Sequence, residues 1–201
     1  MSDALNAINV IQKTGNEYFI DKGNPTGNKL AGFWQWAFSD LASNAMRGVL
    51  AEYIVACELG IETRPRLEWD ACDLITKNGV KLEIKSASYL QTWKQSKISD
   101  ISFKISPTKG WDASTNEYST ETKRQADVYI FCLLKHQDKA TLDPMDFDQW
   151  VFYLLPTATL NEKMPTQKTV RLSSLLKLNP IQAAHGEIAM AIEKIFSGSL
   201  N

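Results

Sequence analysis

Strict alternation of apolar and polar residues marks the segment 80–87. Leu82 and Ile84 fall on one side of an extended backbone, and the charged residues between them fall on the other. This period of two predicts a β-strand with one face toward a core. A second strand is predicted within 67–76, and the Asn-Gly dipeptide at 78–79 that joins the two is a strong hairpin signal. The pattern therefore predicts a β-hairpin here.

Two apolar runs later in the chain predict buried strands. Residues 127–135 are almost continuously apolar, which is typical of a strand covered on both faces, and residues 150–155 are similar. Residues 181–196 show the spacing of an amphipathic helix. The intervening segment 89–125 is polar and turn-rich, with one short strand predicted near 101–105. The later strands are what a central sheet requires.

The main helical region is predicted over residues 31–60. Apolar residues recur there at helical spacing, Ser39 is the expected N-cap and Gly60 is well placed to end the helix. An aromatic cluster lies just before that spacing begins, and such clusters belong more often to a core than to a base-stacking platform. Its members are Phe33, Trp34, Trp36 and Phe38. Residues 1–30, punctuated by Gly and Asn, predict a loosely packed arm before a core of residues 31–201.

Length and composition predict one domain over residues 1–201. A chain of 201 residues with 44 % hydrophobic residues can bury a core, and its net charge of −1 shows that the signs are balanced. This balance argues against disorder. The pI of about 6.1 also argues against a protein that coats nucleic acid by bulk charge. An enzyme can still act on a polyanion, provided that its basic residues are local and a metal supplies positive charge.

Cysteine, histidine and terminal patterns bear on the compartment. Three widely spaced cysteines and two histidines form no zinc-binding pattern, so we expect buried free thiols in a reducing compartment. The N-terminal sequence lacks the features of a signal peptide, and no stretch approaches the ~20 apolar residues of a membrane span. We therefore expect a cytoplasmic protein.

The predicted hairpin carries the candidate chemistry. Glu83 and Lys85 share one face of its second strand, and Asp73 lies near the start of the first. The hairpin can therefore gather two carboxylates and an ammonium group. Clustered carboxylates repel unless a cation neutralises them, and Mg²⁺ prefers such oxygen ligands. A bound metal can activate a water, and Lys85 can position that water or neutralise developing charge. The constellation suits metal-assisted hydrolysis of a phosphodiester.

An ExK tripeptide alone is typical of any solvated strand face, but here a helix with Glu52 and then Asp73 precede it. This order resembles the PD-(D/E)xK superfamily of restriction-endonuclease-like nucleases, and a bacterial group within it. The resemblance rests on the segments FWQWAFSDL (33–41), RGVLAEYIVA (47–56), WDACDL (69–74) and KLEIKSASYLQTW (81–93). It implies an α/β fold with a central mixed β-sheet flanked by helices on both faces, in the core order αβββαβ.

The resemblance also implies a role for each matching residue. Asp73 and Glu83 would ligate Mg²⁺, for which Mn²⁺ can substitute, together with the carbonyl of Ile84 and the carboxylate of Glu52. Lys85 would be the catalytic lysine. Further residues would contact the substrate, namely Arg47, Ser86, Ser88 and Gln91. The implied function is a Mg²⁺-dependent nuclease that hydrolyses DNA with a metal-activated water. Its partner would be nucleic acid, and many such nucleases dimerise, so a homodimer is also considered.

Several assignments have alternatives at this level. The proline of the family motif is absent, and this leaves Asp70 as a rival of Asp73. We prefer Asp73 because it opens the apolar strand directly before the turn. Glu52 could be a helix-surface charge, Arg47 could form a structural salt bridge, and Gln91 could be an ordinary loop residue.

The polar segment and the overall function also have alternatives. Lysines at 94, 97, 104 and 109, interleaved with Trp93 and Trp111, could follow a phosphate backbone or could belong to a solvated loop. The alternative function is a catalytically silent module on the same fold that binds nucleic acid or another protein.

Overall fold

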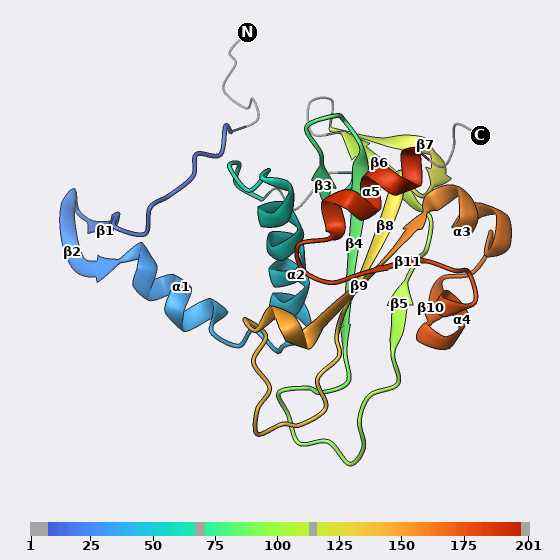
Figure 1. Cartoon of the computed structure of the whole chain (residues 1–201). Coiled ribbons are helices and arrows are strands. Elements are labelled where there is room, and N and C mark those ends of the chain that lie inside the picture. The colour runs from blue at the N-terminus through green and yellow to red at the C-terminus, as the bar shows by residue number, and fades with distance from the viewer. Residues whose placement is uncertain (1–7, 67–70, 113–115, 198–201) are drawn as a thin grey trace, which may run out of the picture.

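A five-stranded mixed sheet forms the centre of the computed structural model, which describes residues 8–66, 71–112 and 116–197. The strands lie in the order β11-β9-β8-β4-β3 (Figure 1). β4 and β8 pair in parallel, and the other neighbours in this sheet pair antiparallel. The strands are β3 (Leu74–Ile75), β4 (Lys81–Ser88), β8 (Val128–Leu134), β9 (Trp150–Pro156) and β11 (Ile181–Ala183).

Helices cover both faces of this sheet. Side chains alternate along the fully buried β8, so Val128 and Ile130 belong to one core layer while Tyr129 and Phe131 belong to the other. α2 and α5 pack on the first face, and α3, α4, β5 and β10 cover the second. Their bounds are α2 (Asn44–Leu59), α3 (Thr157–Lys163), α4 (Leu172–Leu176), α5 (Ile188–Ser197), β5 (Ser102–Lys104) and β10 (Thr169–Arg171). The predicted α/β fold with a mixed sheet between helices is confirmed.

Among the strands of the central sheet and the helices that cover it, the order along the chain is α2-β3-β4-β8-β9-α3-α4-β11-α5. It contains the expected αβββαβ succession, with β9 as a further strand before α3 and with α4 and α5 as further helices. Residues 181–183, predicted as the first turn of the last helix, are instead the strand β11. They pair with β9 because the sheet edge offers their backbone groups hydrogen-bonding partners.

The N-cap of α2 is Ser43 and not Ser39, which was predicted for this position. The helix begins after Ser43, whose Oγ accepts a hydrogen bond from the Met46 N–H (3.4 Å), and not after Ser39, which ends the preceding helix. Gly60 ends α2 as predicted, in the left-handed conformation (φ 60°) that a residue without Cβ adopts at little cost.

A hairpin and a short helix precede α2 and project away from the sheet (Figure 1). They are β1 (Tyr18–Asp21), β2 (Asn24–Lys29) and α1 (Leu30–Phe38). The aromatic cluster predicted to lie in the core is instead exposed. Trp36 is 85 % exposed, and Phe33, Trp34 and Phe38 are between 37 % and 41 % exposed. The prediction is wrong because α1 packs on the segment and hairpin before it and not on the sheet.

The polar segment 89–125 contains β5, which confirms the strand predicted near 101–105, and a second hairpin outside the central sheet. That hairpin pairs β6 (Thr108–Asp112) with β7 (Glu117–Lys123), and the 3₁₀ helix η1 (Phe147–Gln149) precedes β9. Cys57 and Cys132 are free thiols, and Cys72 and Cys132 are buried. Within the described ranges, no helix has the length and apolar character needed to cross a membrane.

Candidate active site

The structure brings Asp73, Glu83 and Lys85 together at the β3 edge of the sheet. Glu83 and Lys85 alternate with the buried Leu82 and Ile84 along β4 and so lie on the opposite face. The Lys85 Nζ lies 2.6 Å from Glu83 Oε1 and 3.7 Å from Asp73 Oδ2. The predicted trio is therefore a compact cluster of two carboxylates around one ammonium group.

The position of Asp73 follows from the way the hairpin closes. The Thr76 N–H donates to Val80 O (2.9 Å) across the turn, and the Asp73 N–H donates to Leu82 O (3.1 Å). β3 has only two residues, so its backbone does not reach Ile84. The Asp73 Oδ2 accepts the hydrogen bond of the Ile84 N–H instead (2.6 Å). The carboxylate thus takes the place of a strand carbonyl and is held beside β4.

Glu52 reaches the same region from α2. Its side chain is largely buried, and Arg66 donates to both of its oxygens, from Nε at 2.5 Å and from Nη2 at 3.0 Å. The Asp73 and Lys85 charges both act on the pKa of Glu52. The alternative of a solvated helix-surface charge does not describe this residue, since a charge is rarely buried without a partner.

Electrostatics couple the members of the cluster. Burial raises the pKa of Glu83 above its usual range, and the neighbouring Asp73 adds to that rise while Lys85 opposes it. Burial also raises the pKa of Glu52, against the hydrogen bond from Arg66. For Lys85, burial acts to lower the pKa, but the carboxylates of Asp73, Glu83 and Glu52 together outweigh it and raise the pKa. The site therefore holds more negative charge than its two cations fully offset.

Three of the residues expected to contact the substrate lie on β4 or in the loop directly after it. Ser86 and Ser88 alternate with Lys85 along β4, so they lie on the opposite face, and the Ser88 Oγ accepts from the Leu90 N–H (3.2 Å). Gln91 is buried and its Nε2 donates to Ser88 O and Ser99 Oγ, each at 3.3 Å. These contacts give Gln91 a structural role in the loop after β4.

Arg47 is buried at the start of α2. Its guanidinium donates to Ala42 O (2.9 Å) and Asn44 Oδ1 (2.8 Å), and burial lowers its pKa. These bonds close the turn between α1 and α2, so its described contacts are structural hydrogen bonds. Its rival role, a phosphate contact, stays a prediction. Asp70, the rival of Asp73, lies outside the described residues.

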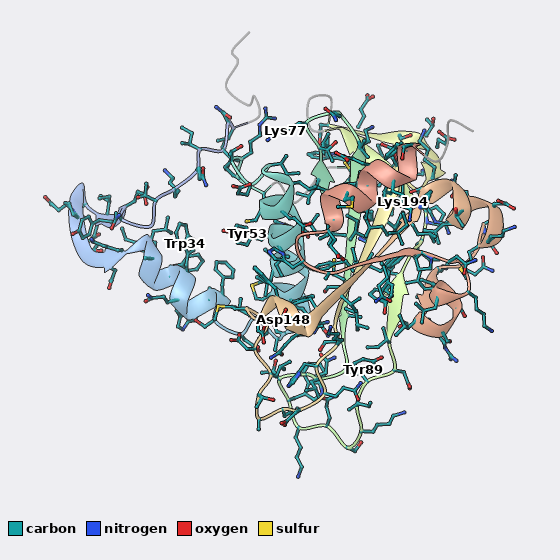
Figure 2. The ribbon with its side chains drawn as sticks, viewed as in Figure 1. Trp34, Tyr53, Lys77, Tyr89, Asp148 and Lys194 are labelled. Carbon is teal, nitrogen blue, oxygen red and sulfur yellow. The ribbon has the colours of Figure 1, made fainter. Side chains whose placement is uncertain are left out.

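A cleft of about 670 Å³ adjoins the cluster. Glu52 and Asp73 form part of its wall, and Arg64 and Arg66 bring positive charge to it. The rest of the wall comes from the segment 8–10, from α2 with Tyr53 (Figure 2), from residues 61, 62 and 65, and from residues 72–75. Glu62 adds a third carboxylate to this wall beside Glu52 and Asp73. The sequence analysis did not single out the two arginines. The Arg-Pro-Arg run shortly after the glycine that ends α2 was the available signal.

The lysines of the polar segment do not form a described groove. Lys94, Lys97, Lys104 and Lys109 are exposed, and Lys97 pairs with Asp100 (3.2 Å). Trp93 is exposed as well and Trp111 is half-buried. Their surroundings agree better with a solvated loop than with a built phosphate track.

The donor set of the cluster fits a hard divalent cation in its chemistry. Both main-chain polar groups of a strand residue point toward the same neighbour, so the Ile84 carbonyl points to the edge where its N–H meets Asp73. Carboxylate and carbonyl oxygens are the ligands that Mg²⁺ prefers. Among the described residues, however, no three His, Cys, Asp or Glu side chains converge closely enough to hold a metal. The Lys85 ammonium occupies the position between the carboxylates.

A known protein family matches most of the chain. No curated protein matches the chain. The family model described as bacteriophage T4 endonuclease IV matches residues 16–174, a stretch that contains the whole cluster and the cleft arginines. This match covers most of the chain and indicates a nuclease with a nucleic-acid substrate. The chain belongs to the bacteriophage T4 endonuclease IV family.

Proposed function

We propose that this nuclease is a Mg²⁺-dependent enzyme of the PD-(D/E)xK type that hydrolyses phosphodiester bonds of DNA. The observation that carries the proposal is the contact of Lys85 with Glu83 and Asp73, at 2.6 and 3.7 Å, on the open edge of the sheet. The order of Glu52 on α2, Asp73 directly before β3 and Glu83 on β4 supports the superfamily assignment.

Asp73, Glu83 and Glu52, with the Ile84 carbonyl, would hold the cation. When bound, Mg²⁺ supplies positive charge that lowers the pKa of a water and polarises a phosphoryl oxygen. In its absence Lys85 neutralises the carboxylates. The cation and the ammonium group would share the oxygens of Glu83 and Asp73. Lys85 would orient the attacking water or offset negative charge that develops on the phosphate.

The cleft beside Glu52 and Asp73 offers a place for the nucleic-acid strand. The chain as a whole has a net charge of −1, so attraction of a polyanion must come from local cations. Arg64 lies in the cleft wall, and Arg66 joins the wall to the cluster through Glu52. Contacts from such arginines to phosphate oxygens position a substrate without reading its sequence.

The test is cutting of linear duplex DNA, single-stranded DNA and RNA with Mg²⁺, with Mn²⁺ and with EDTA. We expect metal-dependent cutting of DNA by the natural protein and its loss in Lys85→Ala. Lys81→Ala is the matched control, because Lys81 lies on the same strand but is exposed. Its hydrogen bonds with Asp127 are made by its backbone, whose N–H donates to the Asp127 carboxylate and whose carbonyl accepts from the Asp127 N–H, each at 2.8 Å.

Two results would contradict the proposal. Cutting that persists in EDTA, or in Lys85→Ala, would move the chemistry away from this cluster. Retained DNA binding without cutting or metal binding would favour the catalytically silent module considered above.

A further inference from the structure

The hairpin β1-β2 and the helix α1 together form a projecting unit, residues 18–38, which is called the arm from here on. Its apolar side chains are unusually exposed. Its helix α1 has the sequence LAGFWQWAF, which contains no charged residue. No residue of α1 is buried in the described part of the chain, although a helix that is apolar all round normally lies inside a protein. Three apolar residues of β1 are exposed as well, between 46 % and 61 %, namely Tyr18, Phe19 and Ile20.

Specific contacts nevertheless fix the start of α1 on the segment before β1. The Ala31 N–H donates to Gly15 O and the Leu30 N–H to Glu17 O, each at 2.9 Å, which ties the start of α1 to the segment before β1. Gly15 has a φ of 87°, and a Cβ there would lie 2.9 Å from the Trp34 ring. Because Gly15 has no side chain, the Trp34 ring can pack directly against its backbone. The Glu17 carboxylate accepts hydrogen bonds from the backbone N–H groups of Thr14 and Gly15. These bonds lower the pKa of Glu17 and hold this segment in place.

The helix has little intrinsic stability of its own. It has nine residues, no side-chain cap, no acidic residue in its first turn and no basic residue in its last. Helices shorter than ~12 residues are marginal in water without tertiary packing. Gly32 and the aromatic residues lower the helix propensity further. An apolar helix of this kind is expected to be covered when the protein works.

The charges of the arm indicate what covers it. Within residues 18–38, Lys22 and Lys29 are partly offset by Asp21, and Glu17 directly before the arm brings the sum to zero. A nucleic-acid surface needs an excess of positive charge, and a membrane-surface helix carries a strongly polar, basic face, which α1 lacks. A patch with both signs at its rim can instead pair with a copy of itself, since each charge can meet its opposite across a two-fold axis.

The exposed apolar area has the size that a dimer requires. With ~200 Å² for each large apolar side chain, the exposed parts of α1 and β1 amount to roughly 700 Å². One partner of a standard protein–protein interface buries about 800 Å². We propose that the arm is the interface through which two copies of this chain associate, with the arm of each copy buried against the arm of the other.

The test is the mass in solution, by sedimentation equilibrium of the full chain. We expect twice the 22.6 kDa of the single chain for the natural protein. Trp36→Asp should weaken the dimer by roughly 30-fold or more, as loss of a central tryptophan does in other interfaces, while Trp36→Phe should weaken it less. Trp36 is 85 % exposed in one chain, so the substitution should not disturb the fold, which circular dichroism checks.

The matched control is Met190→Asp, which introduces the same charge at an exposed apolar position (69 %) on α5, away from the arm. It should leave the dimer unchanged. A natural protein that stays monomeric at all concentrations would overturn the inference, as would a dimer equally stable in Trp36→Asp. A monomer whose tryptophan fluorescence responds to phospholipid vesicles would overturn it in favour of a membrane. Mass and cutting are separate measurements, so this inference can fail while the proposed function stands.

Discussion

Replacement of Lys85 by methionine separates the two tasks that the cluster assigns to this side chain. Lys85→Met keeps the unbranched side chain to within one atom of its length and removes its charge. The ammonium lies 2.6 Å from Glu83 and 3.7 Å from Asp73, on the oxygens that the cation would use. The variant should therefore bind Mg²⁺ more tightly than the natural protein while losing the ability to cut DNA.

The magnitude follows from these distances and from burial. Unit charges 4 Å apart interact by about 4 kcal/mol at an effective dielectric constant of about 20. Lys85 is 26 % exposed and its side chain can move away, so about a third of this interaction energy should apply. Its removal corresponds to a roughly tenfold lower Kd for Mg²⁺ in the variant. Without metal, the variant leaves two part-buried carboxylates unneutralised. We expect a loss of about 2 kcal/mol in the free energy of unfolding, or ~4–8 °C in Tm.

Calorimetric titration with Mg²⁺ measures the first effect, and thermal unfolding in EDTA and in Mg²⁺ measures the second. Saturating Mg²⁺ should raise the Tm of Lys85→Met more than that of the natural protein, because a ligand that binds only the folded state stabilises it. Lys81→Met is the control and should match the natural protein. An unchanged or weaker affinity for Mg²⁺ in Lys85→Met would refute the view that the lysine and the metal share these oxygens.

Two further substitutions test the supports of the site. Glu52→Gln removes a carboxylate that Arg66 contacts at 2.5 and 3.0 Å, and should lower kcat/KM for DNA by roughly 100-fold or more, whereas an unchanged rate would take Glu52 out of the metal site. Gly60→Ala should cost about 1 kcal/mol of unfolding free energy, since φ is 60° and the added Cβ meets only the flexible Lys77 end at 3.4 Å; a higher Tm would contradict this account.

The candidate cluster was predictable because it depends on short-range rules. Alternation along 80–87 placed Glu83 and Lys85 on one face, and the Asn-Gly turn brought Asp73 back to them within a few residues. The apolar runs at 127–135 and 150–155 became β8 and β9 for the same reason, since each segment carries its own pattern. The burial of Glu52 was harder to foresee, because its partner Arg66 lies in a loop without a periodic signal.

The local pattern of this chain by itself determined the hairpin, the two buried strands and the residues that meet at the sheet edge, because turn chemistry and side-chain period act between near neighbours. Only the tertiary structure decided the parallel pairing of Leu82 with Val128, the strand at 181–183 and the exposure of the α1 aromatics. Each of these depends on which surface a segment meets once the whole chain has folded. An exposed apolar helix and a core helix have the same sequence signature, and only the folded chain shows that α1 packs on the segment and hairpin before it and not on the sheet.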